Sequence, residues 1–425
     1  MSKEENRKNF SKYVSQNILG MIGFSCYVLA DSYFISIAKG ADGLTALNLV
    51  MPLYSIIFSI GEMIGVGSAI RYAISKIKKD ADADDYFWNA LIWCILSSML
   101  FVFAGIFFSA DIMRVLGADE HIVAVGNNYT KIFMCFAPMF MCNYVTNAFV
   151  RNDGAPGIAM SATLFSSLFN IVFDYILMFP MNLGMEGAAL ATALSPIIGM
   201  GICSIHFFSK KSSVRLVVCK PSVRKLVAGC QLGVSAFVGE MSSAVITLAF
   251  NFVILKLAGN VGVAAYGVVA NIAIVTTAVF NGVAQGSQPL ISSCFGRGDK
   301  DGCTQLKRMG YTTAFVLAAV MYSILFIFAG QFVAVFNSEG SEMLRLYATE
   351  GVKLYFIGIF FAGINIVGGG AFSATEDAFK AAVVSVARGF VLILGAVFVM
   401  TGVWLAYAVA EGITTFIMLV MVLRV

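Results

Sequence analysis

The sequence predicts an all-α integral membrane protein, in which twelve transmembrane helices form two pseudo-symmetric six-helix lobes around a central cavity. Composition is the first observation: the chain has 425 residues, of which 59% are hydrophobic and only 12% charged. A soluble domain is about a quarter charged. The second observation is a series of apolar stretches, and the third is an internal repeat. This composition argues against a soluble enzyme, a secreted domain and a disordered scaffold.

The apolar stretches are long enough to cross a bilayer, which takes about 20 residues in a helix. They lack the period-two alternation of an outer-membrane barrel. We expect spans at 14–37, 44–74, 87–109, 125–150, 157–180, 186–208, 226–257, 263–295, 309–331, 346–372, 380–400 and 403–423. The polar N-terminus leads into a long apolar run without the short apolar region and cleavage site of a signal peptide, so we expect the first span to be retained.

Positive charges indicate the orientation. With the N-terminus placed in the cytoplasm, 22 of the 28 Lys and Arg residues fall on the cytoplasmic side. That count includes Arg151, Arg388 and the charged central loop. Cytoplasmic loops of membrane proteins carry such an excess. We therefore expect a multi-pass protein of the plasma or inner membrane with both termini in the cytoplasm, and no disulfide among its nine cysteines.

The internal repeat divides the chain into two halves. Four pairs of similar segments recur in chain order at offsets between 218 and 223 residues: Gly61–Gly65 with Gly282–Gly286, Lys131 with Lys353, Ala148–Asp153 with Ala371–Glu376, and Gly184 with Gly402. Two six-span halves that start on the same side of the membrane form a parallel repeat. We expect an N-terminal lobe at 1–208, a cytoplasmic linker at 209–225 and a C-terminal lobe at 226–425.

Ionisable groups at membrane depth cost about 2.5–3.5 kcal/mol on insertion scales, so each is a candidate for function. Five acids qualify: Asp31, Glu62, Asp174, Glu240 and Glu411. Asn170 and Asp174 share a helical face, and Thr192 follows across a tight turn. Their oxygens, with a second carboxylate from Asp31, suit Na⁺ or a held proton. The alternative is that these groups only join helices by hydrogen bonds.

Other polar groups are open to two interpretations. Asn143 and Asn147 repeat the i,i+4 pattern and either support the same site or pack helices together. Glu240, the chief acid of the second half, is expected to attract cationic substrate into a cavity. Gln285 and Gln288 either line that cavity or bond between helices.

The environments of three further residues are inferred only from where they lie in the predicted spans. Met139 lies in a run of Met and aromatic residues that forms either an adaptable drug-binding surface or a lipid-facing stripe. Glu62 and Glu411 can face water if they lie near span ends.

Enzymatic motifs are missing from the sequence. There is no GxSxG, HExxH, Walker A or dinucleotide fingerprint, and no cysteine or histidine spacing that holds a metal. We therefore expect no catalytic residues and no cofactor. An intramembrane enzyme with Asp31 and Asp174 as an aspartyl pair is an alternative that no flanking motif supports. A channel would need a repeated filter loop, and the sequence has none. A transporter without an ATP-binding site must take its energy from an ion gradient.

The combination of twelve spans, Asn170-x-x-x-Asp174, the segment Gly187–Thr192 and the segment Gly286–Leu290 resembles the multidrug and toxic compound extrusion (MATE) family. The likeness covers about residues 17–423. Family members often have a proline near the start of the first and seventh spans, and this chain has none there.

The resemblance implies a cation-coupled antiporter that exports drugs by alternating access. In the branch with a first-span aspartate, it implies a cation site formed by Asp31, Asn170, Asp174 and Thr192, with Na⁺ or H⁺ as the coupling ion. We expect amphipathic, often cationic drugs or metabolites as substrates, a monomer in the lipid bilayer and no binding to nucleic acid. The alternative is a lipid-linked oligosaccharide flippase of the same superfamily, but such a cavity is cationic and the predicted charges are acidic.

Overall fold

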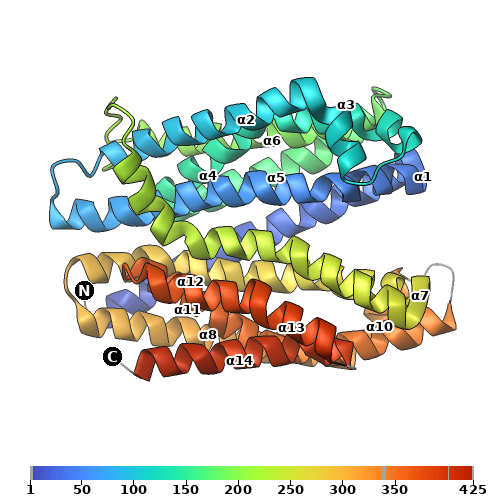
Figure 1. The fold of residues 1–425 in the computed structure, drawn as a ribbon. Helices are drawn as coiled ribbons and strands as arrows, with labels where there is room; N and C mark the ends of the chain where they lie inside the picture. The colour runs from blue at the N-terminus through green and yellow to red at the C-terminus, as the bar shows by residue number, and fades with distance from the viewer. Residues whose placement is uncertain (1–2, 337–340, 401, 424–425) are drawn as a thin grey trace.

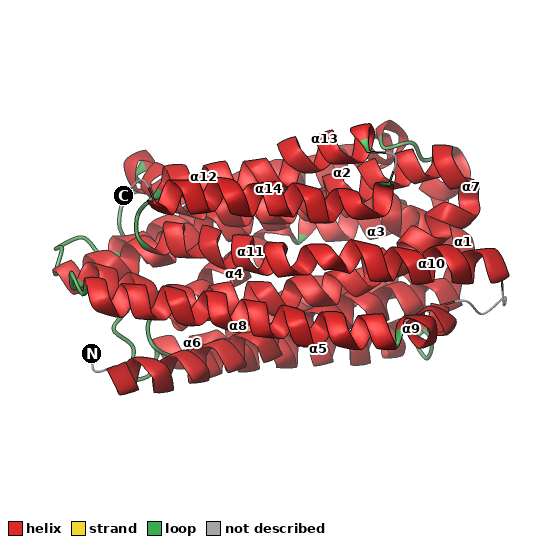
Figure 2. Cartoon of the chain, turned by 90° about the horizontal axis from the view of Figure 1, so that it is seen from below, coloured by secondary structure: helices red, strands yellow, loops and turns green. Residues whose placement is uncertain are grey.

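The structure is a computed structural model that describes residues 3–336, 341–400 and 402–423. The described chain is almost wholly helical (Figures 1 and 2). Its α-helices are α1 (Lys3–Lys78), α2 (Asp85–Val115), α3 (Glu120–Cys135), α4 (Ala137–Asn152), α5 (Pro156–Met178), α6 (Gly184–Phe207), α7 (Val223–Gly296), α8 (Lys300–Ile327), α9 (Ala329–Phe336), α10 (Glu342–Tyr355), α11 (Ile359–Ala374), α12 (Ala378–Val386), α13 (Leu392–Val399) and α14 (Val403–Leu423). A 3₁₀ turn, η1 (Phe356–Gly358), joins α10 to α11, and a π-helical turn, η2 (Ala387–Val391), joins α12 to α13.

The predicted number of spans is confirmed. Within the described residues, 11 helices are long and apolar enough to cross a membrane, and α3 with α4, bent by 46°, makes a twelfth. Side chains on the outside of the bundle are apolar, as contact with lipid requires. Leu100 and Phe107 of α2 and Phe416 of α14, for example, are all exposed.

Two glycines turn the chain between paired spans. Gly40 separates the two spans of α1 with φ 60° and ψ −142°, and Gly259 does the same in α7 with φ 63° and ψ −158°. Positive φ with extended ψ is accessible to glycine and strained for residues with a Cβ. The two glycines are 219 residues apart, the interval of the repeat. Neither first limb contains a proline, and α1 runs without a helix break as far as Gly40.

Several helices begin at a polar residue whose side chain accepts a hydrogen bond from the first turn. These N-caps are Asp119, Ser222, Asp299 and Asp377. Such caps satisfy backbone N–H groups that have no partner inside the helix. They fix where the polar loops end and the spans begin.

Each lobe has its own hydrophobic core. In Figure 1, α2 to α6 form the upper group and α8 and α10 to α14 the lower group, with α1 and α7 between them. The N-terminal core contains Phe133 and Phe149, and the C-terminal core contains Phe250 and Phe356. The start of α1 crosses over, because Val14 packs in the C-terminal core. The connection between the lobes, 208–222, is close to the predicted linker at 209–225.

The lobes meet at the end of the molecule that holds both chain termini, here called the termini end (Figures 1 and 2). Asn6 donates to Gln305 there, at 3.2 Å. Arg71 forms an ion pair with Glu376 and also donates from Nε to the carbonyl oxygen of Ala228 at 3.3 Å. The termini end of this structure is therefore closed by contacts between the lobes.

The glycine pairs of the repeat serve this packing. Gly61 and Gly65 lie against the backbone of α4, where an added Cβ would come within 2.9 Å of Met141 and Tyr144. Gly282 and Gly286 lie in the same way against the start of α1. Small residues allow helix backbones in membranes to approach this closely.

Candidate transport cavity and cation site

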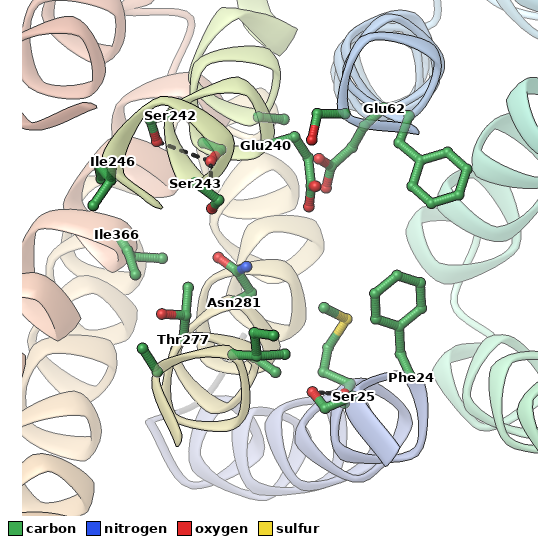
Figure 3. Close-up of a pocket in the computed structure, with 18 of the residues that line it drawn as sticks. Phe24, Ser25, Glu62, Glu240, Ser242, Ser243, Ile246, Thr277, Asn281 and Ile366 are labelled. Carbon is green, nitrogen blue, oxygen red and sulfur yellow. Dashed lines mark hydrogen bonds between the residues drawn. The ribbon is translucent and has the colours of Figure 1, made fainter. Parts of the chain in front are cut away.

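A cavity of about 320 Å³ lies between the lobes above the closed termini end. Both long helices line it, α1 with Phe24, Asp31 and Glu62, and α7 with Glu240 and Asn281. Figure 3 shows acidic, hydroxyl and apolar side chains around the same space. The cavity thus offers carboxylates to a cation and apolar walls to the rest of a ligand.

The predicted cation site has its most buried part between α5 and α6. Asn170 and Asp174 are 0% exposed and Thr192 is 1% exposed. In the amide orientation that satisfies both neighbours, Asn170 donates to Asp174 Oδ2 at 3.1 Å and accepts from the Thr192 hydroxyl at 3.1 Å. The local spacing predicted from the sequence therefore places these three side chains in contact.

Asp31 reaches the same site from α1. It is 6% exposed, and the ring of Phe34, three residues further along α1, lies 6.3 Å from the ring of Tyr175, the residue after Asp174. One oxygen of each carboxylate, Asp31 Oδ1 and Asp174 Oδ1, has no hydrogen-bond partner among the described residues. Asp31 and Thr192 also line the central cavity. Two such carboxylates repel unless a cation or proton neutralises them, so the four residues have the chemistry to hold one Na⁺ or H⁺ beside the cavity.

Among the described residues, the predicted cation site holds only two of the side chains that commonly bind metal ions, Asp31 and Asp174. In the part of the chain that the structure describes, no three His, Cys, Asp or Glu residues come together to hold a metal ion.

Three tyrosines near this site were not predicted. The hydroxyls of Tyr54 and Tyr129 are hydrogen-bonded to each other, and Tyr54 lines the central cavity together with Asp31. Tyr27 lines the central cavity one helical turn before Asp31. That spacing was a usable signal in the sequence for Tyr27, but Tyr54 and Tyr129 come from spans whose packing cannot be read from local pattern.

The two asparagines of α4 lie elsewhere. Asn143 and Asn147 line a second cavity of about 110 Å³ in the N-terminal lobe. Asn147 donates to the carbonyl oxygen of Ala159 at 3.1 Å and to the Thr163 hydroxyl at 3.2 Å, which matches the helix-packing interpretation. Neither asparagine is hydrogen-bonded to the four cation-site residues in the described structure.

Of the residues predicted to line the substrate cavity, three line it and one does not. Glu240, Gln285 and Gln288 line the central cavity. Met139 lines neither cavity, so its assignment to the substrate cavity is wrong. Its side chain is 36% exposed just after the bend between α3 and α4, which fits the lipid-facing interpretation.

Glu62 and Glu411 correct a second expectation, since neither faces water at a span end. Glu62 is 7% exposed and lines both cavities. Glu411 is 1% exposed and is bound by Arg388, with 2.6 Å between Arg388 Nη2 and Glu411 Oε1. Asn365 also donates to Glu411 Oε2 at 2.7 Å.

Arg388 itself is not a cytoplasmic charge. It lies in η2, inside the span from Ala378 to Val399, and lines the central cavity. Its charge was counted with the loops because its acidic partner is in the following span, where sequence pattern gives no sign of the pairing. One of the 22 cytoplasmic charges is therefore removed, and the bias remains large.

Twelve spans in two lobes, with a carboxylate-lined cavity between them, define a multi-pass membrane transporter. The sequence model of the MatE family matches residues 17–176 and 236–401. The chain belongs to this family, whose members are transporters and not enzymes, so the predicted absence of enzyme activity is confirmed.

Curated relatives and solved structures agree with that assignment. Multidrug export protein MepA of Staphylococcus aureus (strain MRSA252) is 26% identical over 413 residues, covering 93% of this chain and 89% of the relative. MepA of Staphylococcus saprophyticus is 25% identical over 408 residues, with the same coverage. The fold matches a structure described as the outward-facing conformation of a multidrug resistance MATE family transporter, with a TM-score of 0.92, 20% identity and coverage of 99% and 96%. It also matches a transporter of Pyrococcus furiosus described as having a binding pocket of reverse polarity, with a TM-score of 0.90, 20% identity and coverage of 98% and 95%.

Proposed function

We propose that this protein exports amphipathic, often cationic small molecules across the cell membrane in exchange for Na⁺ or H⁺. The observation that carries this proposal is the buried group of Asp31, Asp174, Asn170 and Thr192, two members of which also line the central cavity. The name of the MepA relatives, multidrug export protein, supports the substrate class.

Coupling follows from the charges. A ligand shifts a conformational equilibrium only by its differential affinity for the two states. Asp31 and Asp174 come from different helices, α1 and α5, so a movement of α1 against α5 changes how strongly they bind a cation. Occupancy by Na⁺ or H⁺ then favours one facing state, and substrate in the cavity favours the other.

The orientation is part of the proposal. The Lys and Arg distribution supports a cytoplasmic location for both termini. With the termini in the cytoplasm, the contact between the lobes at the termini end closes the cytoplasmic side, and we assign the structure to an outward-facing state. The likeness to a transporter solved in an outward-facing conformation supports that assignment.

The flippase alternative is less well supported. A cavity for a lipid-linked pyrophosphate needs several free cationic groups. The central cavity has Arg388, which is already paired with Glu411, and three acids, Asp31, Glu62 and Glu240. We therefore favour cationic or neutral substrates.

The experiment is gradient-driven efflux from proteoliposomes. Asp31→Asn and Asp174→Asn should each abolish efflux driven by the coupling ion while membrane insertion is unaffected, because removing a buried charge does not hinder insertion. Asp111→Asn, at an exposed acid of α2, is the matched control and should export normally. Equilibrium binding of a fluorescent cationic dye should persist at least in part. Full efflux in either of the two cation-site variants would overturn the proposed coupling site.

A further inference from the structure

Two carboxylates from opposite lobes face each other in the central cavity. Glu62 belongs to the second limb of α1 in the N-terminal lobe, and Glu240 to the first limb of α7 in the C-terminal lobe. Figure 3 shows their side chains directed toward one another, and both residues line the central cavity and the second cavity. Two negative charges that the lobes bring close together raise the free energy unless a positive charge lies between them.

The surroundings of Glu62 compensate its charge only in part. Gln285 of α7 donates to Glu62 Oε1 at 3.1 Å, and Arg151 of α4 in turn donates to Gln285 Oε1 at 2.7 Å. Arg151 is therefore separated from Glu62 by one amide. The carboxylate of Glu240 has no hydrogen-bond partner among the described residues and remains open to the cavity.

A buried amide lines the same space. Gln288 follows Gln285 by one helical turn on α7, is 6% exposed and lines the cavity. Its Oε1 has no hydrogen-bond partner in the described part of the chain. A buried acceptor without a donor costs free energy. A cationic ligand would supply the positive charge and the donors that this oxygen and the two carboxylates lack.

We propose that Glu62 and Glu240 form a cation clamp, in which the positively charged group of a substrate is held between one carboxylate from each lobe. This inference rests on the proposed export of cationic compounds and identifies where their charge is bound. It assigns Glu62 to substrate recognition, and it makes the site depend on the spacing of the lobes.

The clamp is connected to the contact that closes the termini end. A Cβ added at Gly233 would lie 2.0 Å from the carbonyl oxygen of Met63, the residue next to Glu62. Gly233 is two helical turns before Glu240 on α7. Separation of α1 from α7 at the termini end must therefore move the two carboxylates apart. A cation held by both carboxylates stabilises the closed termini end, which gives substrate the differential affinity that transport requires.

The test is equilibrium binding to the purified full-length protein without any ion gradient. The probes are tetraphenylphosphonium, a permanent cation, and triphenylphosphine oxide, a neutral compound of similar shape. The ratio of their affinities measures charge selectivity. Glu62→Gln can still accept the hydrogen bond from Gln285, so it isolates the effect of the charge. Glu350→Gln, at an exposed acid outside the cavity, is the matched control.

We expect Glu62→Gln and Glu240→Gln each to lower the charge selectivity about tenfold through weaker binding of the cation, with neutral binding changed less than twofold. The double variant should bind the two probes about equally, and Glu62→Asp should retain most of the selectivity. Unchanged selectivity in Glu62→Gln would overturn the clamp while leaving export intact. A wild-type protein that binds neither probe would instead count against the proposed function.

Discussion

Gly67 of the N-terminal lobe lies directly on Gly229 of the C-terminal lobe. A Cβ at Gly67 would be 2.0 Å from the carbonyl oxygen of Gly229, and a Cβ at Gly229 would be 2.6 Å from the hydroxyl oxygen of Ser68. No side chain fits between these backbones, so the closed termini end requires glycine at this point. The two glycines belong to α1 and α7, the helices that carry Glu62 and Glu240.

We predict that Gly67→Ala prevents closure of the termini end. The added methyl would have to displace backbone atoms of α7, so the outward-facing state should be lost. Efflux from proteoliposomes should fall at least tenfold with normal membrane expression. Gly201→Ala is the control, because nothing lies within 4 Å of a Cβ at Gly201. Normal efflux in Gly67→Ala would show that the lobes need not approach this closely.

The ion pairs at the termini end should make a smaller contribution. Glu376 pairs with Arg71 and with Lys78, the latter at 3.4 Å, and their side chains are 23–46% exposed. Partly exposed pairs contribute about 0–1 kcal/mol. We predict that Glu376→Gln shifts the equilibrium toward opening at the termini end by no more than about fivefold, and that high salt has a similar effect on the wild type.

Native Cys230 can report this opening. It lies one residue after Gly229, is partly buried and packs against the N-terminal lobe. Its labelling by a membrane-impermeant maleimide, applied from the termini side and quantified by mass spectrometry, should be faster in Glu376→Gln than in the wild type. Equal labelling rates in Glu376→Gln and the wild type would contradict a role for this ion pair in closure.

Arg388 and Glu411 stabilise the C-terminal lobe in a different way. Glu411 is buried, the Arg388 side chain is only 14% exposed, and Arg388 contacts both oxygens of Glu411. Removing one partner of a buried ion pair costs about 3–5 kcal/mol because the other charge is left unpaired. We predict that Glu411→Gln and Arg388→Gln each lower the melting temperature in detergent, and that the double variant is more stable than either single variant. A double variant less stable than both would indicate that the two residues act independently.

Contacts between neighbouring helices in the chain can be predicted from the sequence, but contacts between distant segments cannot. Asn170, Asp174 and Thr192 were predictable because they lie on consecutive helices joined by a short turn. The pairing of Glu62 with Glu240 was not, since it crosses between lobes. The fold class could be predicted because length, hydropathy and the repeat are properties of the chain itself.

Errors arose where local composition hides a tertiary partner. Arg388 looked like a loop charge because its neutralising acid is one span away. Met139 looked like a cavity residue because Met-rich runs occur both in adaptable sites and on lipid-facing surfaces. In both cases the surroundings of the side chain are set by packing between helices, which periodicity alone does not specify.

Substitution of Thr192 can show whether the coupling ion is Na⁺ or H⁺. A proton needs only a carboxylate, whereas Na⁺ needs several oxygen ligands, of which the Thr192 hydroxyl would be one. We predict that Thr192→Val weakens Na⁺-driven efflux about tenfold and leaves H⁺-driven efflux within twofold of the wild type. Thr192→Ser, which keeps the hydroxyl, is the control and should behave as the wild type under both gradients. The measurement is dye efflux from proteoliposomes under an imposed Na⁺ gradient or an imposed pH gradient. Equal losses under the two gradients would mean that Thr192 acts by orienting Asn170, to which it is hydrogen-bonded at 3.1 Å, and not as a ligand.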